Sequence, residues 1–414
     1  ALHMACADAR VACARALLSA GTNVEAATAD GHTPLHAASS KGQEVCVRML
    51  LDAGASTAAT SADGATPLHM ACLAGHPACA RVLLEAGANK EADSKGGATP
   101  LHIACLKRHE ACVRVLLAGG AHVNARTLDG RTPLCIACEV DAEGCVHALL
   151  EASANLELVT RTGATALLLA CKLGHSVCAR ALLHAGADVA AANRVGNVPL
   201  HVACMAGHDA CARVLLDAGA DIEAVNKHGA TSLHVACAAA HGACVRVLIE
   251  AGASKQAVDK DGWTPLHAAC AHGYEAGVRA LLSAGANVEA KAVDDQTALH
   301  MACHHGHDAC VRALLDAHAN VEAVIAHGWT PLHMACSKGH AACAQALLSA
   351  GANIEATNDD GVTPLHIACV YGHEAVVRVL LGAGASPIAS SADGASPLSA
   401  ARSRGHACVV RLLE

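Results

Sequence analysis

Residues 300–310, HMACHHGHDAC, carry four side chains whose types and spacing are typical of a metal site. His300, Cys303, His307 and Cys310 form the pattern H-x2-C-x3-H-x2-C. Imidazole and thiolate are ligands that zinc prefers, and four of them complete its tetrahedral shell. The same thiols could instead serve a redox centre or form disulfides. The elements that position these side chains decide between these chemistries.

A period of 33 residues runs through the chain, and it never shifts by a residue. It is marked by a threonine at almost every multiple of 33, with Val198 and Ser396 at the two remaining multiples. The threonines are Thr33, Thr66, Thr99, Thr132, Thr165, Thr231, Thr264, Thr297, Thr330 and Thr363. The 414 residues hold 414/33, or about 12.5, such units, which makes thirteen full or partial repeats.

One unit, residues 330–362, shows how each repeat is built. Thr330 is expected to cap a short helix that has Pro331 in its first turn and Gly339 at its end. A second helix is expected from about Ala341 to Gly351, followed by a polar, turn-rich finger. The residues predicted to be buried are Leu332, Ala335, Cys336, Cys343, Leu347 and Leu348. Because no unit can bury its apolar face alone, neighbouring units must stack.

The period and its recurring words resemble the ankyrin-repeat family over the whole chain. The words are GH before the second helix, LL…AGA after it, and TPLH at Thr33–His36, Thr66–His69, Thr99–His102, Thr264–His267, Thr330–His333 and Thr363–His366. The resemblance implies an all-α repeat solenoid of stacked helix-turn-helix repeats with β-hairpin-like finger loops. It also implies a concave surface that binds protein partners, and no enzymatic activity.

We expect residues 1–414 to form a single domain. Residues 396–414 are expected to cap it, because Arg402 takes a core position and Ser399 replaces the histidine. The first repeat begins with the apolar ALHMAC and has no such cap, so we expect the natural protein to extend beyond residue 1.

The four-residue pattern of the opening motif is repeated but often loses a member. Leu168 takes the place of the first histidine, Ser39 of the first cysteine, and Val376 of the second cysteine. A zinc site does not survive such a loss, whereas a packing position does, and free cysteine behaves as a small hydrophobic residue. Of 23 cysteines, all but Cys135 and Cys408 occupy the two core positions. We therefore predict no metal, cofactor or catalytic residues, and free thiols in a reducing, cytoplasmic compartment. The resemblance implies that the TPLH histidine ties the finger to the helix start.

Composition narrows the class of partner. The net charge of −8 gives no reason to expect nucleic acid, whose phosphates require a basic face. No apolar run approaches the roughly 18 residues of a membrane span, so direct membrane insertion is not expected.

The finger tips of the middle repeats carry a basic row that is a candidate for binding an acidic segment of a protein partner. Its members are Lys95, Arg161, Arg194, Lys227 and Lys260, with Arg131 three residues along in the repeat that breaks the row. The alternative is that lysine and arginine are simply common on solvated turns.

A second candidate surface gathers the aromatic residues, which all lie between residues 263 and 371. Trp263 and Trp329 occupy the finger position before the threonine, and Tyr371 ends a first helix. The neighbouring candidates are His304, His305 and Lys338, and the histidine pair would make binding sensitive to pH. The alternative is that each indole only covers its own finger and that the histidines are solvated.

The leading hypothesis is a non-enzymatic scaffold or adaptor that binds a protein partner through its concave face and fingers. One alternative is that the chain is the cytosolic ankyrin portion of a larger channel, enzyme or signalling protein. A remoter one is a thiol-rich redox or metal-binding protein. The most altered repeats, near residues 132–170, are expected to be locally softer, because Ser153 replaces a helix-ending glycine there and Cys135 a histidine.

Overall fold

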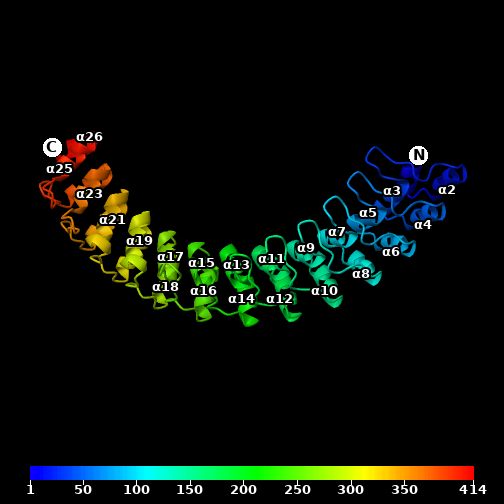
Figure 1. The fold of residues 1–414 in the computed structure, drawn as a ribbon, viewed down its shortest axis with the longest axis horizontal. Coiled ribbons are helices and arrows are strands. Elements are labelled where there is room, and N and C mark those ends of the chain that lie inside the picture. The colour runs from blue at the N-terminus through cyan, green and yellow to red at the C-terminus, as the bar shows by residue number, and fades with distance from the viewer. The chain divides into compact units, whose positions relative to one another are not determined.

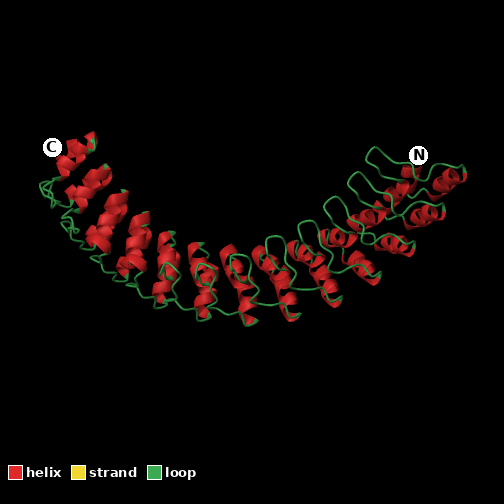
Figure 2. Cartoon of the chain, viewed as in Figure 1, coloured by secondary structure: helices red, strands yellow, loops and turns green.

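The computed structural model describes residues 1–414, whose contacts divide them into two compact units. Unit 1 comprises Ala1–Pro199 with Asp217–Ala220, and unit 2 comprises Leu200–Leu216 with Asp221–Glu414. Each unit is a stack of helix pairs joined by loops, without a β-sheet (Figures 1 and 2). The predicted all-α repeat architecture is therefore confirmed.

Each repeat contributes two short antiparallel helices, and equivalent helices of neighbouring repeats pack on one another within each unit (Figure 1). The first helices are α1 (Leu2–Ala7), α3 (Pro34–Ser40), α5 (Pro67–Ala74), α7 (Pro100–Leu106), α9 (Pro133–Glu139), α11 (Ala166–Leu173), α13 (Pro199–Ala206), α15 (Ser232–Ala238), α17 (Pro265–Ala271), α19 (Ala298–His305), α21 (Pro331–Lys338), α23 (Pro364–Tyr371) and α25 (Pro397–Ser403). The second helices are α2 (Val11–Ser19), α4 (Glu44–Asp52), α6 (Pro77–Glu85), α8 (Glu110–Ala118), α10 (Glu143–Glu151), α12 (Ser176–His184), α14 (Asp209–Asp217), α16 (Gly242–Glu250), α18 (Glu275–Ser283), α20 (Asp308–Asp316), α22 (Ala341–Ser349), α24 (Glu374–Gly382) and α26 (Ala407–Leu413). Two single turns of 3-10 helix, η1 (Val293–Asp295) and η2 (Ala326–Gly328), lie in finger loops.

The ends of the first helices follow from local chemistry, as predicted. In α21 the Thr330 hydroxyl accepts a hydrogen bond from the backbone N–H of His333, 3.4 Å away. Gly339 ends the helix in the left-handed region, with φ of 80°. The second helix buries Cys343, Ala344 and Leu347. Leu348 is half-buried rather than buried, because it lies one helical step of about 100° beyond the apolar stripe.

The histidine of each TPLH word joins its own helix start to the end of the following finger. In α17 the backbone N–H of Thr264 donates to Nδ1 of His267 at 3.2 Å, and Nε2 lies 3.1 Å from the carbonyl oxygen of Gln296. Because Nδ1 accepts, the proton sits on Nε2 and the ring is neutral. The same two bonds are made by His36, His69, His102, His234, His333 and His366. The structural role implied by the family resemblance is thus confirmed for these residues.

A second histidine lies in the loop between the two helices of a repeat. It packs on the glycine that ends the first helix of the preceding repeat. The ring of His373 lies against Gly339 so closely that an added Cβ would meet Nδ1 at 2.7 Å. Its Nε2 lies 3.1 Å from the carbonyl oxygen of Ser337, near the end of the same helix. The glycine–histidine contacts are Gly42–His76, Gly75–His109, Gly207–His241, Gly273–His307, Gly306–His340, Gly339–His373 and Gly372–His406. One glycine therefore serves both the backbone turn and the seat of an imidazole ring.

The chain itself varies this contact. At three places the glycine position holds a residue with a Cβ in the left-handed region, and the loop position of the next repeat then holds no histidine. The pairs are Ala9 with Gln43, Arg108 with Ala142, and Ala240 with Tyr274. A fourth exception, Asp141, keeps its histidine, His175, but the ring turns so that Nδ1 lies 2.7 Å from the carbonyl oxygen of Cys138. A Cβ at the helix end and a ring seated on it exclude one another.

The finger loops are hairpin-like turns that are tied to their neighbours by main-chain bonds. Within one finger the backbone N–H of Ser94 donates to the carbonyl oxygen of Ala98 at 3.1 Å. Between fingers the backbone N–H of Lys95 donates to the carbonyl oxygen of Asp63 at 3.0 Å. A glutamate that recurs at one position of the repeat adds a bond between neighbouring fingers. In one example, the backbone N–H of His122 donates to the Glu91 carboxylate at 2.8 Å. The fingers are thus fixed relative to the helices of their own unit.

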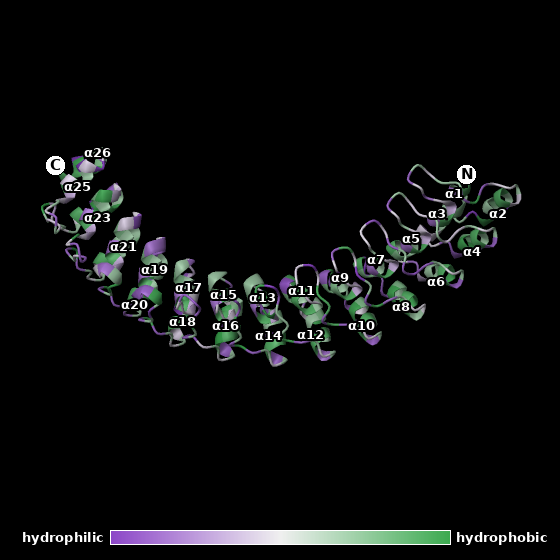
Figure 3. Cartoon of the chain, viewed as in Figure 1, coloured by the Kyte–Doolittle hydropathy of each residue, from purple (hydrophilic) through white to green (hydrophobic).

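Leucine, alanine and cysteine form the core between the helix layers (Figure 3). A first-helix cysteine touches the second-helix cysteine of the next repeat, as Cys72 does with Cys112, and none of the 23 cysteines is in a disulfide. Cys13 was predicted to be in the core but is exposed. Its position packs on the preceding repeat, and no repeat precedes it in this sequence. Cys135, outside the two core positions, is buried.

The altered repeats near residues 132–170 form helices of the usual length and gain polar contacts of their own. The Arg108 guanidinium donates to the carbonyl oxygen of Asp141 at 2.7 Å, and the Cys178 thiol donates to the Asp141 carboxylate at 3.3 Å. Ser153 adopts the left-handed conformation that glycine has elsewhere, with φ of 60°. The predicted softness of this segment remains a prediction, which amide exchange would test.

Candidate functional site

Most polar side chains already have a partner within the scaffold, which narrows the search for a site. Several second-helix arginines, for example, pair with carboxylates: Arg114 lies 2.8 Å from Glu110 and 2.6 Å from Glu151 on the next repeat. Histidines of both kinds, threonines and finger glutamates are bonded as described above. The residues that the repeats do not use are therefore the candidates for binding.

The residues of the opening motif do not gather into a metal site. Within the structure no group of three or more histidine, cysteine, aspartate or glutamate side chains is placed to hold an ion. Burial raises the pKa of the Cys237 thiol to about 12, and likewise that of Cys369 to about 12. Thiols with such pKa values carry almost no thiolate at neutral pH, which makes them poor nucleophiles and poor ligands.

The basic finger residues are all exposed, but they divide between the two units. Lys95, Arg161 and Arg194 belong to unit 1, and Lys227 and Lys260 belong to unit 2. These five make no ion pair in the structure, whereas Arg131 pairs with Glu139 at 3.2 Å. Aspartates at the neighbouring finger position interrupt the row, so neither unit presents a uniformly basic edge. These finger aspartates include Asp63, Asp129 and Asp261.

The two tryptophans, equivalent in sequence, differ in their surroundings. The Trp329 ring lies against His333, with ring centroids 6.1 Å apart. Trp263 instead lines two neighbouring hollows on the face made by the first helices and fingers of unit 2. Tyr371, at the end of α23, is 56% exposed and stacks on His373 at 6.1 Å.

The two hollows beside Trp263 each have a volume of about 490 Å³; the first has a largely apolar wall, and the wall of the second mixes apolar with polar and charged side chains. The first, toward α15, is lined by Met205, Val235, Ala238, Ala239, Ala268 and His272, among others. The second, toward α19, is lined by Met301, Met334, His304, His305, Lys260 and Asp261, among others. A half-buried indole between two hollows of this kind resembles the anchors that dominate protein interfaces.

The main chain of Trp263 is held firmly in place. Its N–H donates to the Asp259 carboxylate at 2.8 Å, and its carbonyl oxygen accepts both from the Asp259 N–H at 3.0 Å and from Nε2 of His234 at 2.8 Å. Because these bonds exist without a ligand, binding would not have to order this segment.

The histidine candidates lie at the end of α19, beside the second hollow. The rings of His304 and His305 are 4.7 Å apart, and His305 stacks on His307 at 6.2 Å. Burial, followed by the charge of Lys338, lowers the pKa of His304, and burial with the surrounding imidazoles lowers the pKa of His305. Of the candidates predicted from the sequence, the structure thus brings His304, His305 and Lys338 together, with Trp263 across the hollow.

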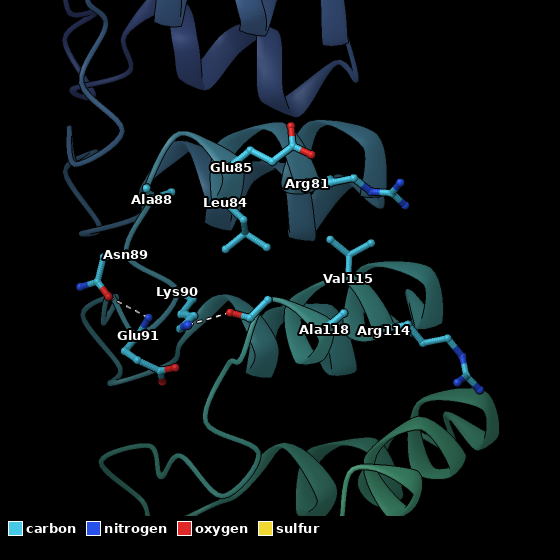
Figure 4. A pocket seen from close by; sticks show the side chains of 12 residues that line it. Arg81, Leu84, Glu85, Ala88, Asn89, Lys90, Glu91, Arg114, Val115 and Ala118 are labelled. Carbon is cyan, nitrogen blue, oxygen red and sulfur yellow. Dashed lines mark hydrogen bonds between the residues drawn. The ribbon is translucent and has the colours of Figure 1, made fainter.

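A groove of about 800 Å³ lies in unit 1 between α6 and α8 (Figure 4). Leu84, Val115 and Ala118 face one another across it, whereas Arg81 and Arg114 extend away from it. Lys90 is already bonded to the carbonyl oxygen of Gly119 at 2.7 Å. A similar groove recurs between α20 and α22, so its size reflects small side chains between second helices more than a built site.

The sequence did not single out the apolar residues around Trp263. Met205, Val235, Met301 and Met334 were missed because each is an ordinary helix residue by itself. The available signal was their phase: they fall at two fixed places of the first helix, where other repeats carry alanine, as at Ala268 and Ala238.

No helix has the length and apolar character needed to span a bilayer.

A family model described as ankyrin repeats in three copies matches residues 1–61, 54–127, 120–193, 200–292, 289–358 and 351–414. A search of curated proteins finds no match.

Two solved structures show the same kind of repeat. The ankyrin repeat domain of human ASB11 is 32% identical, with 53% of this chain and 98% of that chain covered and a TM-score of 0.49. The ankyrin repeat domain of Bcl-3, a member of the IkappaB protein family, is 36% identical, with 49% and 93% covered and a TM-score of 0.46. Since the family model matches nearly every residue, this chain belongs to the ankyrin-repeat family.

Proposed function

We propose that the chain is a non-enzymatic scaffold that binds a protein partner through the first helices and finger loops of unit 2, with Trp263 as the central anchor. The family supports the general role, because ankyrin repeats are a protein-interaction module. The single observation that carries the specific proposal is the position of Trp263 between a largely apolar hollow and a second hollow whose wall mixes apolar and polar side chains. Its main chain is held by bonds to Asp259 and His234, so the indole is presented before any partner arrives.

Replacing the indole tests the proposal, and the chain supplies its own control. Trp263→Ala is expected to weaken partner binding about thirtyfold, because truncating a central aromatic anchor removes about 2 kcal/mol or more. Trp329→Ala removes the same side chain from the equivalent position two repeats along, where the ring lies on His333. It is expected to change the affinity less than about threefold.

The measurement is quantitative affinity capture from native extract, followed by titration of the captured protein against each purified variant. Circular dichroism establishes that both variants are folded. A partner retained equally by wild type and Trp263→Ala would refute the assignment of the anchor. So would a partner lost equally with both substitutions, since that would indicate a general effect of finger packing.

A further inference from the structure

A basic cluster, defined here as His272, His304, His305 and Lys338, lies at the C-terminal ends of α17, α19 and α21. Three consecutive repeats of unit 2 contribute to it. His272, His305 and Lys338 occupy the same place in the repeat and are exposed, and His304 is half-buried beside His305. At this place other repeats of unit 2 carry Ala206 and Ala239, so the scaffold does not require a basic residue.

No carboxylate of the chain neutralises the cluster. Lys338 makes no ion pair, and the carboxylates that begin α18 and α20 are already paired: Glu275 with Arg279 at 2.9 Å and Asp308 with Arg312 at 2.6 Å. The elements packed around the cluster carry further titratable and charged groups. Those on helices are His234 of α15, His267, Glu275 and Arg279 of α17 and α18, His300, Asp308 and Arg312 of α19 and α20, and His333 of α21; those in loops and fingers are Tyr274, His307, His340, His228, Asp259, Lys260, Asp261, Lys291, Asp294 and Asp295.

The groups that act on His304 and His305 are cationic or imidazole. After burial, the pKa of His304 is lowered by Lys338, His305 and His340, and the pKa of His305 by His307, His272, His340 and Lys338. The finger carboxylates Asp261 and Asp294 line the adjoining hollow but are not among these influences. No carboxylate forms an ion pair with the cluster, so its basic groups are open to an anion from outside the chain.

We propose that the basic cluster is a docking site for an acidic, carboxylate-rich segment of a partner protein, and that its affinity for this segment rises as the pH falls. This deepens the proposed function and rests on it, because the cluster adjoins the Trp263 hollow through His304 and His305. Neighbouring first helices are about 8–10 Å apart, so three repeats span about 16–20 Å, which an extended segment of about six residues covers.

The pH dependence follows from linkage. In the free chain the two histidines resist protonation, so they are neutral at and above their ordinary pKa of about 6.5. A bound carboxylate favours the charged ring and raises its pKa. Binding then takes up protons, and the affinity increases by up to about tenfold per pH unit for each histidine as the pH falls between the bound and free pKa values.

A fluorescent glutamate-rich peptide of about nine residues, and the same peptide with glutamine in place of glutamate, are suitable probes. Anisotropy titrations at about pH 7.5 and about pH 5.8 with the full chain are expected to show binding of the glutamate peptide that is at least tenfold tighter at the lower pH. The His304→Gln/His305→Gln variant should lose most of this pH dependence. Lys338→Gln should weaken binding at both pH values and leave the pH dependence in place.

His184→Gln, which changes an exposed histidine of α12 in unit 1, is the matched control and should behave as wild type. Circular dichroism at both pH values ensures that the folded chain is compared. Equal binding of the two peptides, equal affinity at the two pH values, or unchanged pH dependence in the double variant would each overturn the proposal. Tighter binding of a single-stranded oligonucleotide of the same charge would overturn the choice of a peptide.

The outcome is separable from that of the proposed function. If Trp263→Ala abolishes partner capture while the glutamate peptide does not bind, the scaffold proposal stands and the acidic site is refuted. If the peptide binds as expected while Trp263→Ala has no effect on any partner, the anchor assignment fails and the acidic site stands.

Discussion

Acidification from about pH 6.5 to pH 4.5 is expected to lower the stability of the folded chain steeply, and the loss begins about two pH units above the ordinary pKa of its carboxylates. The cause is the row of buried histidines that end the TPLH words and their variants VPLH, TSLH and TALH, because burial lowers their pKa values in the folded state. They are His36, His69, His102, His201, His234, His267, His300 and His333. Nδ1 now accepts a hydrogen bond from the threonine N–H, as at His267 and Thr264. Protonation of Nδ1 would break this bond, because two N–H groups would then face each other.

The sign follows from the two states. The unfolded chain binds protons at these histidines below about pH 6.5, and the folded chain does not, so the free energy of unfolding falls as the pH falls. Above pH 6.5 the contribution is complete. Each histidine removes about 1.4 kcal/mol per pH unit until its folded pKa is reached. For His300, whose folded pKa is about 4, the total is about 3 kcal/mol.

Urea unfolding followed by circular dichroism between about pH 7.5 and pH 4.5 measures this effect. The midpoint should fall continuously below about pH 6.5. His267→Gln/His300→Gln should be less stable than wild type at neutral pH but show a shallower dependence, because glutamine can replace the capping acceptor without titrating. A midpoint that is constant over this range, or an unchanged slope in the double variant, would contradict the structural role of these rings.

Gly339→Ala is expected to destabilise the chain by about 3 kcal/mol, whereas Gly351→Ala should cost about 1 kcal/mol. Both glycines have positive φ, 80° and 90°, so both substitutions place alanine in the left-handed region. At Gly351 nothing lies within 4 Å of the added Cβ. At Gly339 the Cβ would meet Nδ1 of His373 at 2.7 Å, and moving the ring would break its bond to the carbonyl oxygen of Ser337.

A double-mutant cycle separates the clash from the backbone strain. His373→Ala should cost less in the Gly339→Ala background than in wild type, because the ring has already lost its seat. Chemical denaturation of the four proteins supplies the coupling energy. Equal costs for Gly339→Ala and Gly351→Ala, or additive effects of Gly339→Ala and His373→Ala, would show that the ring and the glycine are independent.

The fold was predictable because each repeat states its own boundaries locally. Thr330 and Gly339 define α21 through a cap and a left-handed turn, and these need no knowledge of the neighbours. The sequence also held a signal for the glycine–histidine contact, because the two positions change together: Arg108 goes with Ala142, and Ala240 with Tyr274. It becomes legible only once the structure shows that the two positions, one repeat and one residue apart, touch.

The candidate site was less predictable, because it depends on side-chain sizes in several repeats at once. The sequence treats Trp263 and Trp329 alike, and only their neighbours distinguish them: one ring lies on His333, and the other lies between hollows bordered by Met205 and Met301. The exposure of Cys13 has a similar cause, since its core position is completed by a preceding repeat.

The central claim is that the cysteines and histidines are packing and hydrogen-bonding parts of the repeats. The most direct test is a thiol titration of the protein in metal-free buffer, without prior treatment with a reductant. In the folded chain two thiols, those of Cys13 and Cys408, should react rapidly with a disulfide reagent, and the other 21 of the 23 should not. After denaturation without reductant, all 23 should react, and no stoichiometric metal should be released. Fewer than 23 reactive thiols in denaturant, or zinc released in proportion to the protein, would contradict the claim.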